Sequence, residues 1–120
     1  MVAQKDWVPE AGDIVWLHFD PQAGHEQAGH RPALVLSPRS YNRKTGMMLC
    51  VPLTTCIKGY PFEVAVGSGA KDRAASVALS DQVRCLDWRA RGAKIKGKAT
   101  AHELADVKAR LAALLGLAPA

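Results

Sequence analysis

Residues 14–19 read IVWLHF, and this stretch decides the fold. In a β-strand, successive side chains alternate between the two faces of the sheet. The even-numbered side chains Ile14, Trp16 and His18 share one face, and the odd-numbered ones share the other. Both faces are largely apolar, which is typical of a strand inside a small β-barrel. The segment predicts a mainly β protein with a buried strand near its start.

Five further segments have the short, apolar character of strands. They are residues 33–36, 47–51, 62–66, 76–79 and 82–86. Between the first two, residues 42–46 read NRKTG, a composition typical of turns, so we expect a hairpin there. Residues 21–29 contain two glycines and few apolar side chains, and they predict a loop.

The chain closes with the pattern of an amphipathic helix. Thr100 and Glu103 have the spacing of a capping box, and Gly116 can take the left-handed conformation after the last turn. Between them, apolar side chains recur every three or four residues, at Leu104, Val107, Leu111 and Leu114. We therefore predict an α+β fold that is mainly β, with one domain over residues 1–120 and this helix packed on a barrel.

Cationic side chains are concentrated just before this helix. The chain has 16 Lys and Arg against 11 Asp and Glu, which is a net charge of +5. From Arg84 to Lys98, the run of Arg and Lys is opposed only by Asp87. Such a run attracts polyanions, because each neutralised phosphate releases condensed counterions. A solvated face that keeps the protein soluble is the other interpretation.

Cysteine usage and the first residues bear on location. Cys50, Cys56 and Cys85 are an odd number without a CxxC pair, which is typical of reduced thiols in a cytosolic protein. Residues 1–10 contain charges and no apolar run, so we expect neither a signal peptide nor a membrane anchor. The expected location is the cytoplasm.

Residues 25–31, HEQAGHR, gather two histidines, a glutamate and an arginine around one glycine. Metal-free RNA cleavage needs a base for the 2′-hydroxyl proton, a cation for the phosphorane charge and an acid for the 5′-oxygen. The loop holds candidates for all three, and a polar surface loop with a solvated ion pair is the alternative. The sequence has no phosphate loop, zinc signature, nucleotide fingerprint or nucleophile elbow, so we expect any catalysis to need neither metal nor cofactor.

Three weaker motifs lie further along the chain. Thr54 and Thr55 end the segment CVPLTT, where hydroxyls either satisfy backbone groups in a turn or donate to a phosphate. Asp81 and Gln82 either cap a turn or reach into the same groove. Residues 88–91, WRAR, set an aromatic ring among cations, which suits stacking on bases; a core tryptophan between solvated arginines is the alternative.

Taken together, seven phrases resemble the MazF/PemK toxin family, and its MazF branch in particular. They are GDIVWLHFDP, GHEQAGHRPALVLSP, YNRKTGM, CVPLTT, KGYPFEV, LSDQV and WRARGA, in the family's order from Gly12 to Ala93. The resemblance implies an SH3-like β-barrel with helices at its edge and a homodimer. It also implies sequence-specific, metal-independent cleavage of single-stranded RNA by a toxin, whose cognate acidic antitoxin blocks the RNA groove.

The same resemblance implies roles for particular residues. Arg31 and Thr54 match the catalytic positions of MazF-type members, and Glu26 is associated with that site. His25 and Asp81 match positions implicated in the PemK branch, but Leu79 replaces an arginine of that branch, so Asp81 is left as a groove residue. Which of Glu26 and His25 is the general base stays open. The remaining expected RNA contacts are Gln27, His30, Thr55, Lys58, Gln82, Trp88, Arg89 and Arg91.

A second class of function stays open on the sequence. The same fold serves toxins that poison DNA gyrase, and a binding module that does no chemistry would also be small, basic and dimeric. The HEQAGHR and VPLTT phrases favour the ribonuclease.

Overall fold

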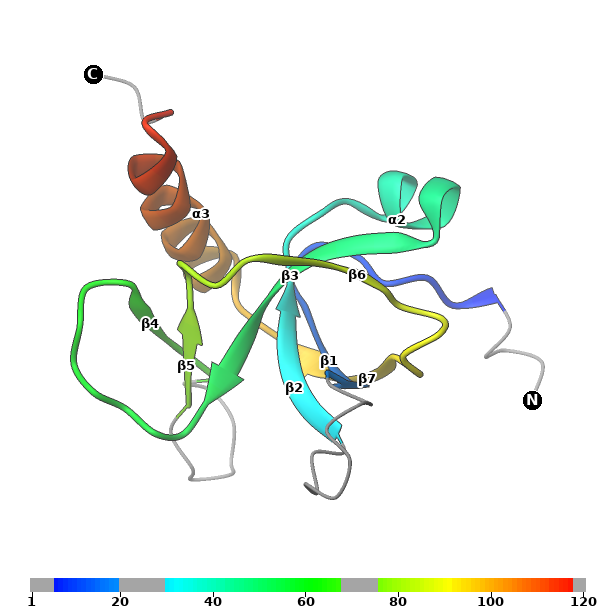
Figure 1. The fold of residues 1–120 in the computed structure, drawn as a ribbon, viewed down its shortest axis with the longest axis horizontal. Coiled ribbons are helices and arrows are strands. Elements are labelled where there is room, and N and C mark those ends of the chain that lie inside the picture. Colours follow the sequence, from blue (N-terminus) through cyan, green and yellow to red (C-terminus); the bar gives the residue numbers. More distant parts are fainter. Residues whose placement is uncertain (1–5, 20–29, 68–75, 118–120) are drawn as a thin grey trace.

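The described part of the chain folds as a bent antiparallel sheet with the helices α2 and α3 (Figure 1). The computed structural model describes residues 6–19, 30–67 and 76–117. The elements in these ranges are β1 (Asp13–His18), β2 (His30–Val35), α2 (Arg39–Thr45), β3 (Met47–Thr54), β4 (Glu63–Val66), β5 (Ser76–Leu79), β6 (Arg84–Asp87), β7 (Lys94–Lys98) and α3 (Ala101–Leu115).

Strand β3 organises the sheet, because its partners change along its length. Its first half pairs with β6, its middle pairs with β2, and its last residues pair with β5. The strand order is β4-β5-β3-β2-β1-β7, with β6 beside β3. All of these pairs are antiparallel, and the result is a half-barrel of the α+β class, as the sequence predicts.

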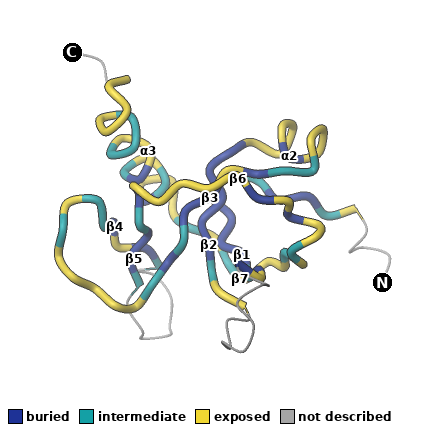
Figure 2. The backbone as a smooth tube through the Cα atoms, viewed as in Figure 1, coloured by how far each residue is buried: buried dark blue, intermediate teal, exposed yellow. Residues whose placement is uncertain are grey.

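The alternation of β1 separates two cores, as its sequence predicts. Val15 and Leu17 are fully buried on one face of the sheet, and Ile14 is buried on the other. Figure 2 shows the buried backbone concentrated where β1, β2 and β3 cross. The first core also contains Val8, Phe19, Ala33, Val35, Met48, Cys50, Leu86 and Trp88. The second contains Leu34, Leu36, Val51, Leu53, Val64, Val66, Ala78 and Val107.

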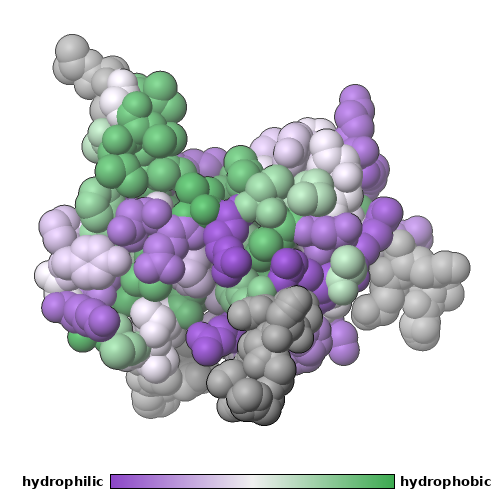
Figure 3. All heavy atoms as spheres, viewed as in Figure 1, coloured by the Kyte–Doolittle hydropathy of each residue, from purple (hydrophilic) through white to green (hydrophobic). Residues whose placement is uncertain are grey.

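Helix α3 covers the second core. Its capping box is present, with Thr100 and Glu103 each accepting the other's backbone N–H at 3.0 Å, and Gly116 is left-handed at φ 75°. Val107 is buried and Leu111 packs beside it, but Leu114 at the end of the predicted stripe is 49% exposed. Figure 3 shows the apolar surface that this end of the helix presents. Neither α2 nor α3 is long and apolar enough to cross a membrane.

The predicted turn at residues 42–46 is wrong. The chain forms helix α2 there and ends it at Gly46, which has φ 75°. The side chain of Asn42 is fully buried, donates to the carbonyls of Pro9 and Ser37, and accepts from the Ser37 hydroxyl. The asparagine that suggests a turn therefore joins the N-terminal segment to the sheet. The predicted pairing of the flanking strands is confirmed, with a helix as the connection.

Strand β7 has no counterpart among the predicted strands. Lys94, Lys96 and Lys98 alternate along it, and it forms the sheet edge beside β1. Lysines on an edge strand discourage pairing with other chains, so the composition is typical of such an edge although Ile95 is its only large apolar side chain. The loop predicted at residues 21–29 lies outside the described residues.

Candidate active site and nucleic-acid interface

Arg31 and Thr54 lie at the same end of two adjacent strands. The ladder between β2 and β3 pairs Ala33 with Pro52. Arg31 and Thr54 each lie two residues beyond that pair, at the same end of β2 and β3, and the alternation of side chains gives them the same face of the sheet. The pairing of β2 with β3 itself ends at Ala33 and Pro52, and Thr54 pairs with Val77 of β5. An arginine and a threonine hydroxyl therefore lie at the same end of two neighbouring strands.

The two side chains differ in how firmly the protein holds them. Arg31 is exposed, and no hydrogen bond or ion pair to the described part of the chain fixes its guanidinium. Thr54 is half-buried, and its hydroxyl oxygen accepts from the Cys56 backbone N–H at 3.0 Å. That bond orients the Thr54 oxygen and leaves its proton free for donation. An oriented hydroxyl and an exposed cation at the same end of the sheet suit the binding of a phosphate.

The loop after β3 is shaped by one carboxylate. Glu63 accepts the backbone N–H groups of Lys58 and Gly59, at 2.9 and 2.7 Å. These bonds hold the backbone of the loop in place. The Lys58 side chain is exposed and belongs to neither hydrophobic core. Thr55 is exposed at the start of the same loop. Both side chains are available to a ligand.

Tyr60 joins this loop to Asp81. The phenol donates to the Asp81 carboxylate at 3.3 Å, and desolvation together with that negative charge raises the pKa of Tyr60. The phenol therefore stays protonated at neutral pH and remains a donor. The side chains of Asp81 and Gln82 are exposed, and the Gln82 N–H closes a turn onto the Leu79 carbonyl. The Tyr60 phenol also has a side-chain hydrogen bond with Gln82, so Asp81 and Gln82 both hold Tyr60 in place.

Arg84 is a cation that sequence reasoning did not single out. It pairs with Cys50 across β6 and β3, and its guanidinium lies over the Phe19 ring at 5.2 Å. Burial raises the pKa of the Cys50 thiol to about 12, although the Arg84 charge opposes this. Cys50 is therefore a neutral core side chain and no nucleophile. Two features of the sequence could have identified Arg84 as a candidate: it begins the cationic run, and it lies two residues after Gln82.

Three residues of the Trp88–Arg91 turn are predicted RNA contacts, and two of them, Trp88 and Arg91, bond to the protein itself. Trp88 is 4% exposed, and its indole N–H donates to the Asn42 carbonyl at 2.9 Å. The structure thus assigns Trp88 to the core and corrects its prediction as a base-stacking residue, because no face of the ring is open. Arg91 donates to the carbonyls of His18 and Phe19, which ties this turn to the end of β1. Arg89 is exposed and lies over the Trp88 ring.

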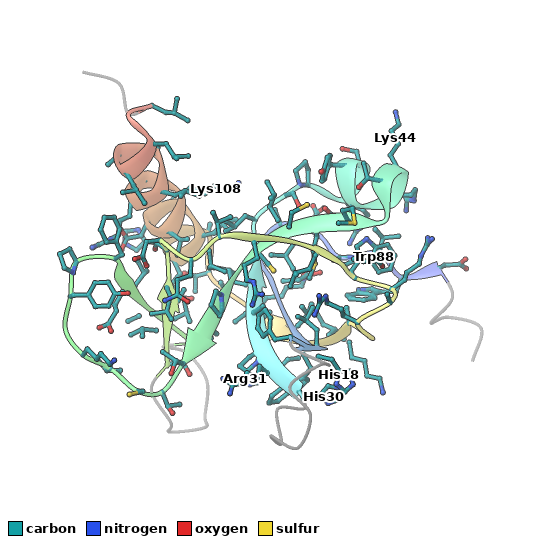
Figure 4. All side chains as sticks on the ribbon, viewed as in Figure 1. His18, His30, Arg31, Lys44, Trp88 and Lys108 are labelled. Carbon is teal, nitrogen blue, oxygen red and sulfur yellow. The ribbon has the colours of Figure 1, made fainter. Side chains whose placement is uncertain are left out.

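Three of the predicted site residues, His25, Glu26 and Gln27, lie outside the described residues. His30 is described: it is exposed at the start of β2, directly beside Arg31 (Figure 4). Within residues 6–19, 30–67 and 76–117, no group of three His, Cys, Asp or Glu side chains could hold a metal ion. With a net charge of +5, the arrangement defines a small basic β-sheet protein that is suited to bind a polyanion.

Comparison with known proteins narrows that class. Residues 10–115 match the model of the PemK-like, MazF-like toxins of type II toxin–antitoxin systems, and the chain belongs to this family. It is 56% identical to the endoribonuclease toxin MazF of Escherichia coli K12 over 92% of this chain and 96% of that protein. It is 35% identical to the endoribonuclease PemK of Escherichia coli, covering 88% of this chain and 81% of that one.

Solved structures agree with the family. A crystal structure of MazF from Deinococcus radiodurans superposes with a TM-score of 0.80 at 52% identity, covering 92% of this chain and 99% of the other. A MazE–MazF crystal structure from the same organism gives 0.81 at 46% identity, with coverages of 94% and 100%. Both the sheet and the helices of this chain therefore follow the family's fold.

Proposed function

We propose that this chain is a sequence-specific endoribonuclease toxin that cuts single-stranded RNA in the cytoplasm and so arrests translation and growth. The observation that carries the proposal is the placement of Arg31 and Thr54 at the same end and on the same face of two adjacent strands. Support comes from the family match and from two relatives named as endoribonucleases. A non-catalytic binding module is not favoured, because those relatives are enzymes.

The cut bond is attacked by the 2′-hydroxyl of the preceding ribose. Arg31 stabilises the charge that develops on the phosphorane, since a guanidinium keeps its proton at any physiological pH. The Thr54 hydroxyl donates to a phosphate oxygen and holds the phosphate in line with the attack. Glu26 or His25 accepts the 2′-hydroxyl proton, and the 5′-oxygen leaves with a proton. The products are a 5′-hydroxyl end and a 2′,3′-cyclic phosphate, which can open to a 3′-phosphate.

Other side chains guide the RNA to this point. Lys58, Arg84 and Arg89 are exposed cations that can serve this purpose. Each offers phosphate contacts that carry no base preference, so sequence choice comes from the polar side chains Gln27, Thr55 and Gln82. Because phosphate contacts release counterions, RNA affinity falls with rising salt.

The active form is a homodimer whose RNA groove is partly shared. Apolar side chains of 38% to 69% exposure lie on the end of α3 and just after it, on β3 and in the segment before β6: Leu114, Leu115, Leu117, Leu49 and Val83. Figure 3 shows the apolar surface at the end of the helix. An apolar surface of this kind is a common mark of a protein interface. A cognate antitoxin with an acidic segment competes with RNA for the cationic groove. The MazE–MazF complex of a relative supports the existence of such a partner.

The test is cleavage of an RNA that carries one deoxyribose just before the mapped cut. The purified toxin should cut the all-ribose strand in EDTA and leave the substituted bond intact while still binding the oligonucleotide. End analysis should give a 5′-hydroxyl. Cleavage of the deoxy-substituted bond at the normal rate would overturn the 2′-hydroxyl mechanism, and a folded protein that cuts no RNA would overturn the proposed function.

A further inference from the structure

Three rings form a row on the sheet face opposite to the Arg31 side chain. His18 and His30 are paired residues of β1 and β2, and their ring centroids lie 4.2 Å apart. The Trp16 ring continues the row at 6.4 Å from His30. Both histidines are exposed and Trp16 is half-buried. Figure 4 shows His18, His30 and Arg31 together at one end of the molecule.

The row begins where α3 stops covering this face. Ile14 and Leu34 are paired residues of the same two strands, and both are buried in the core beneath α3. Two and four residues further along β1, on the same face, come half-buried Trp16 and exposed His18. The end of this sheet face that α3 leaves uncovered therefore carries aromatic rings. Because side chains alternate, His30 and Arg31 lie on opposite faces at the same strand end.

Two unpaired cations border the row. Lys94 is paired with Trp16 across β1 and β7, and the Lys96 ammonium lies over the Trp16 ring at 5.2 Å. Lys98, the next lysine of β7, forms a salt bridge with buried Asp13 at 2.8 Å. Neither Lys94 nor Lys96 forms a salt bridge within the described ranges. Their charge is therefore available to an anionic ligand.

We propose that Trp16, His18, His30, Lys94 and Lys96 form a second contact surface for the RNA, here called the ring face. It rests on the proposed function, since the strand it binds is the one cut beside Arg31. A base outside the cleaved bond stacks on the His18 and His30 rings, while its neighbouring phosphates contact Lys94 and Lys96. Aromatic rings that alternate with cations are the combination that binds single strands, because every base has a face to stack.

The geometry favours RNA over an acidic peptide at this surface. A carboxylate-rich segment would use the two lysines and the imidazole N–H donors, but it has no planar group to stack on the faces of the rings. A nucleotide uses both the lysines and the faces of the rings, and His30 directly precedes Arg31 in β2. The ring face then lengthens the RNA footprint beyond the cut site.

The experiment measures affinity for an uncleavable RNA with a deoxyribose before the cut, in a long form with flanking nucleotides and in a short form without them. For His18→Ala, we expect binding of the long form to weaken about tenfold and that of the short form to change little. His18→Phe should keep most of the affinity, because a ring without a titratable nitrogen still stacks. On cleavable RNA, His18→Ala should raise KM more than it lowers kcat.

Controls and an abasic scan separate the outcomes. His102→Ala and Lys108→Ala, both exposed on α3, should bind both forms like the parent. One flanking abasic site should weaken the parent and leave His18→Ala unaffected. Equal loss on long and short forms, or no loss, would overturn the ring face while wild-type cleavage persists. A loss of affinity only for an acidic peptide would assign the surface to a protein partner and also overturn the inference.

Discussion

The start of β2 and the turn after β6 both present arginines, yet they use them differently. Arg31 is exposed, and nothing in the described part of the chain holds its guanidinium. Arg91 donates to two carbonyls at the end of β1, and its neighbour Trp88 is buried with a bonded indole N–H. The first region is open to a ligand, whereas the second satisfies the protein's own backbone. A cation near a motif is thus a candidate for function only where its hydrogen-bond donors have no partner within the protein.

Arg31→Ala should produce the largest change. We expect cleavage to fall by about a hundredfold or more, because one preorganised charge contact with the transition state is lost. The unfolding midpoint should stay within error, since Arg31 packs in neither core. Single-turnover cleavage and thermal unfolding measure the two effects, with Arg43→Ala on exposed α2 as the matched control. Normal cleavage by folded Arg31→Ala would show that Arg31 has no role in the reaction, and the difference drawn between the two regions would be wrong.

Thr54→Ala should reduce cleavage about tenfold, which is the loss expected for one neutral hydrogen bond of about 1.4 kcal/mol to the phosphate. The hydroxyl also accepts from the Cys56 N–H, so a small loss of stability accompanies the change. Thr54→Ser keeps the hydroxyl and should restore most of the rate. If serine fails to restore it although the protein is folded, the threonine acts through packing and not through its hydroxyl.

At the second region the expected effect is on stability. Trp88→Phe removes the indole N–H that donates to the Asn42 carbonyl, and the free energy of unfolding should fall by about 1 kcal/mol. RNA affinity of the folded variant should match the parent, because the ring is buried. Urea unfolding and binding to uncleavable RNA provide the two measurements. A selective loss of RNA affinity would return Trp88 to the interface.

The titration of Cys50 tests how far water is excluded from the core beside both regions. Its pKa of about 12 in the folded chain lies above the ordinary value of 9.0. Above pH 9 the unfolded chain ionises this thiol and the folded chain does not, so stability is full below pH 9 and is lost as pH rises toward 12. Between about pH 8 and pH 10 the loss should be on the order of 1 kcal/mol. Cys50→Ala should show a shallower decline, and parallel pH profiles for the two proteins would contradict the buried, neutral thiol.

Much of the fold was predictable because its signals are local. The alternation of residues 14–19 places side chains on two faces whatever the strand packs against, and the Thr100 and Glu103 pair caps a helix through its own backbone. The cationic turn and the motifs that contain Arg31 and Thr54 could likewise be identified from neighbouring residues in the sequence. Their roles in the reaction stay predictions, and so do those of His25, Glu26 and Gln27.

The tertiary structure decided what depends on groups that meet across the chain. Asn42 enters a helix because Pro9 and Ser37 supply its partners, and β7 is a strand because β1 offers it an edge. The change of partners along β3 likewise has no trace in its own residues. By itself the sequence determined periodicity, caps and charge, since these act between neighbours. Only the fold decided which polar groups are bonded internally and which stay free for a ligand, because that depends on distances between residues far apart in the chain.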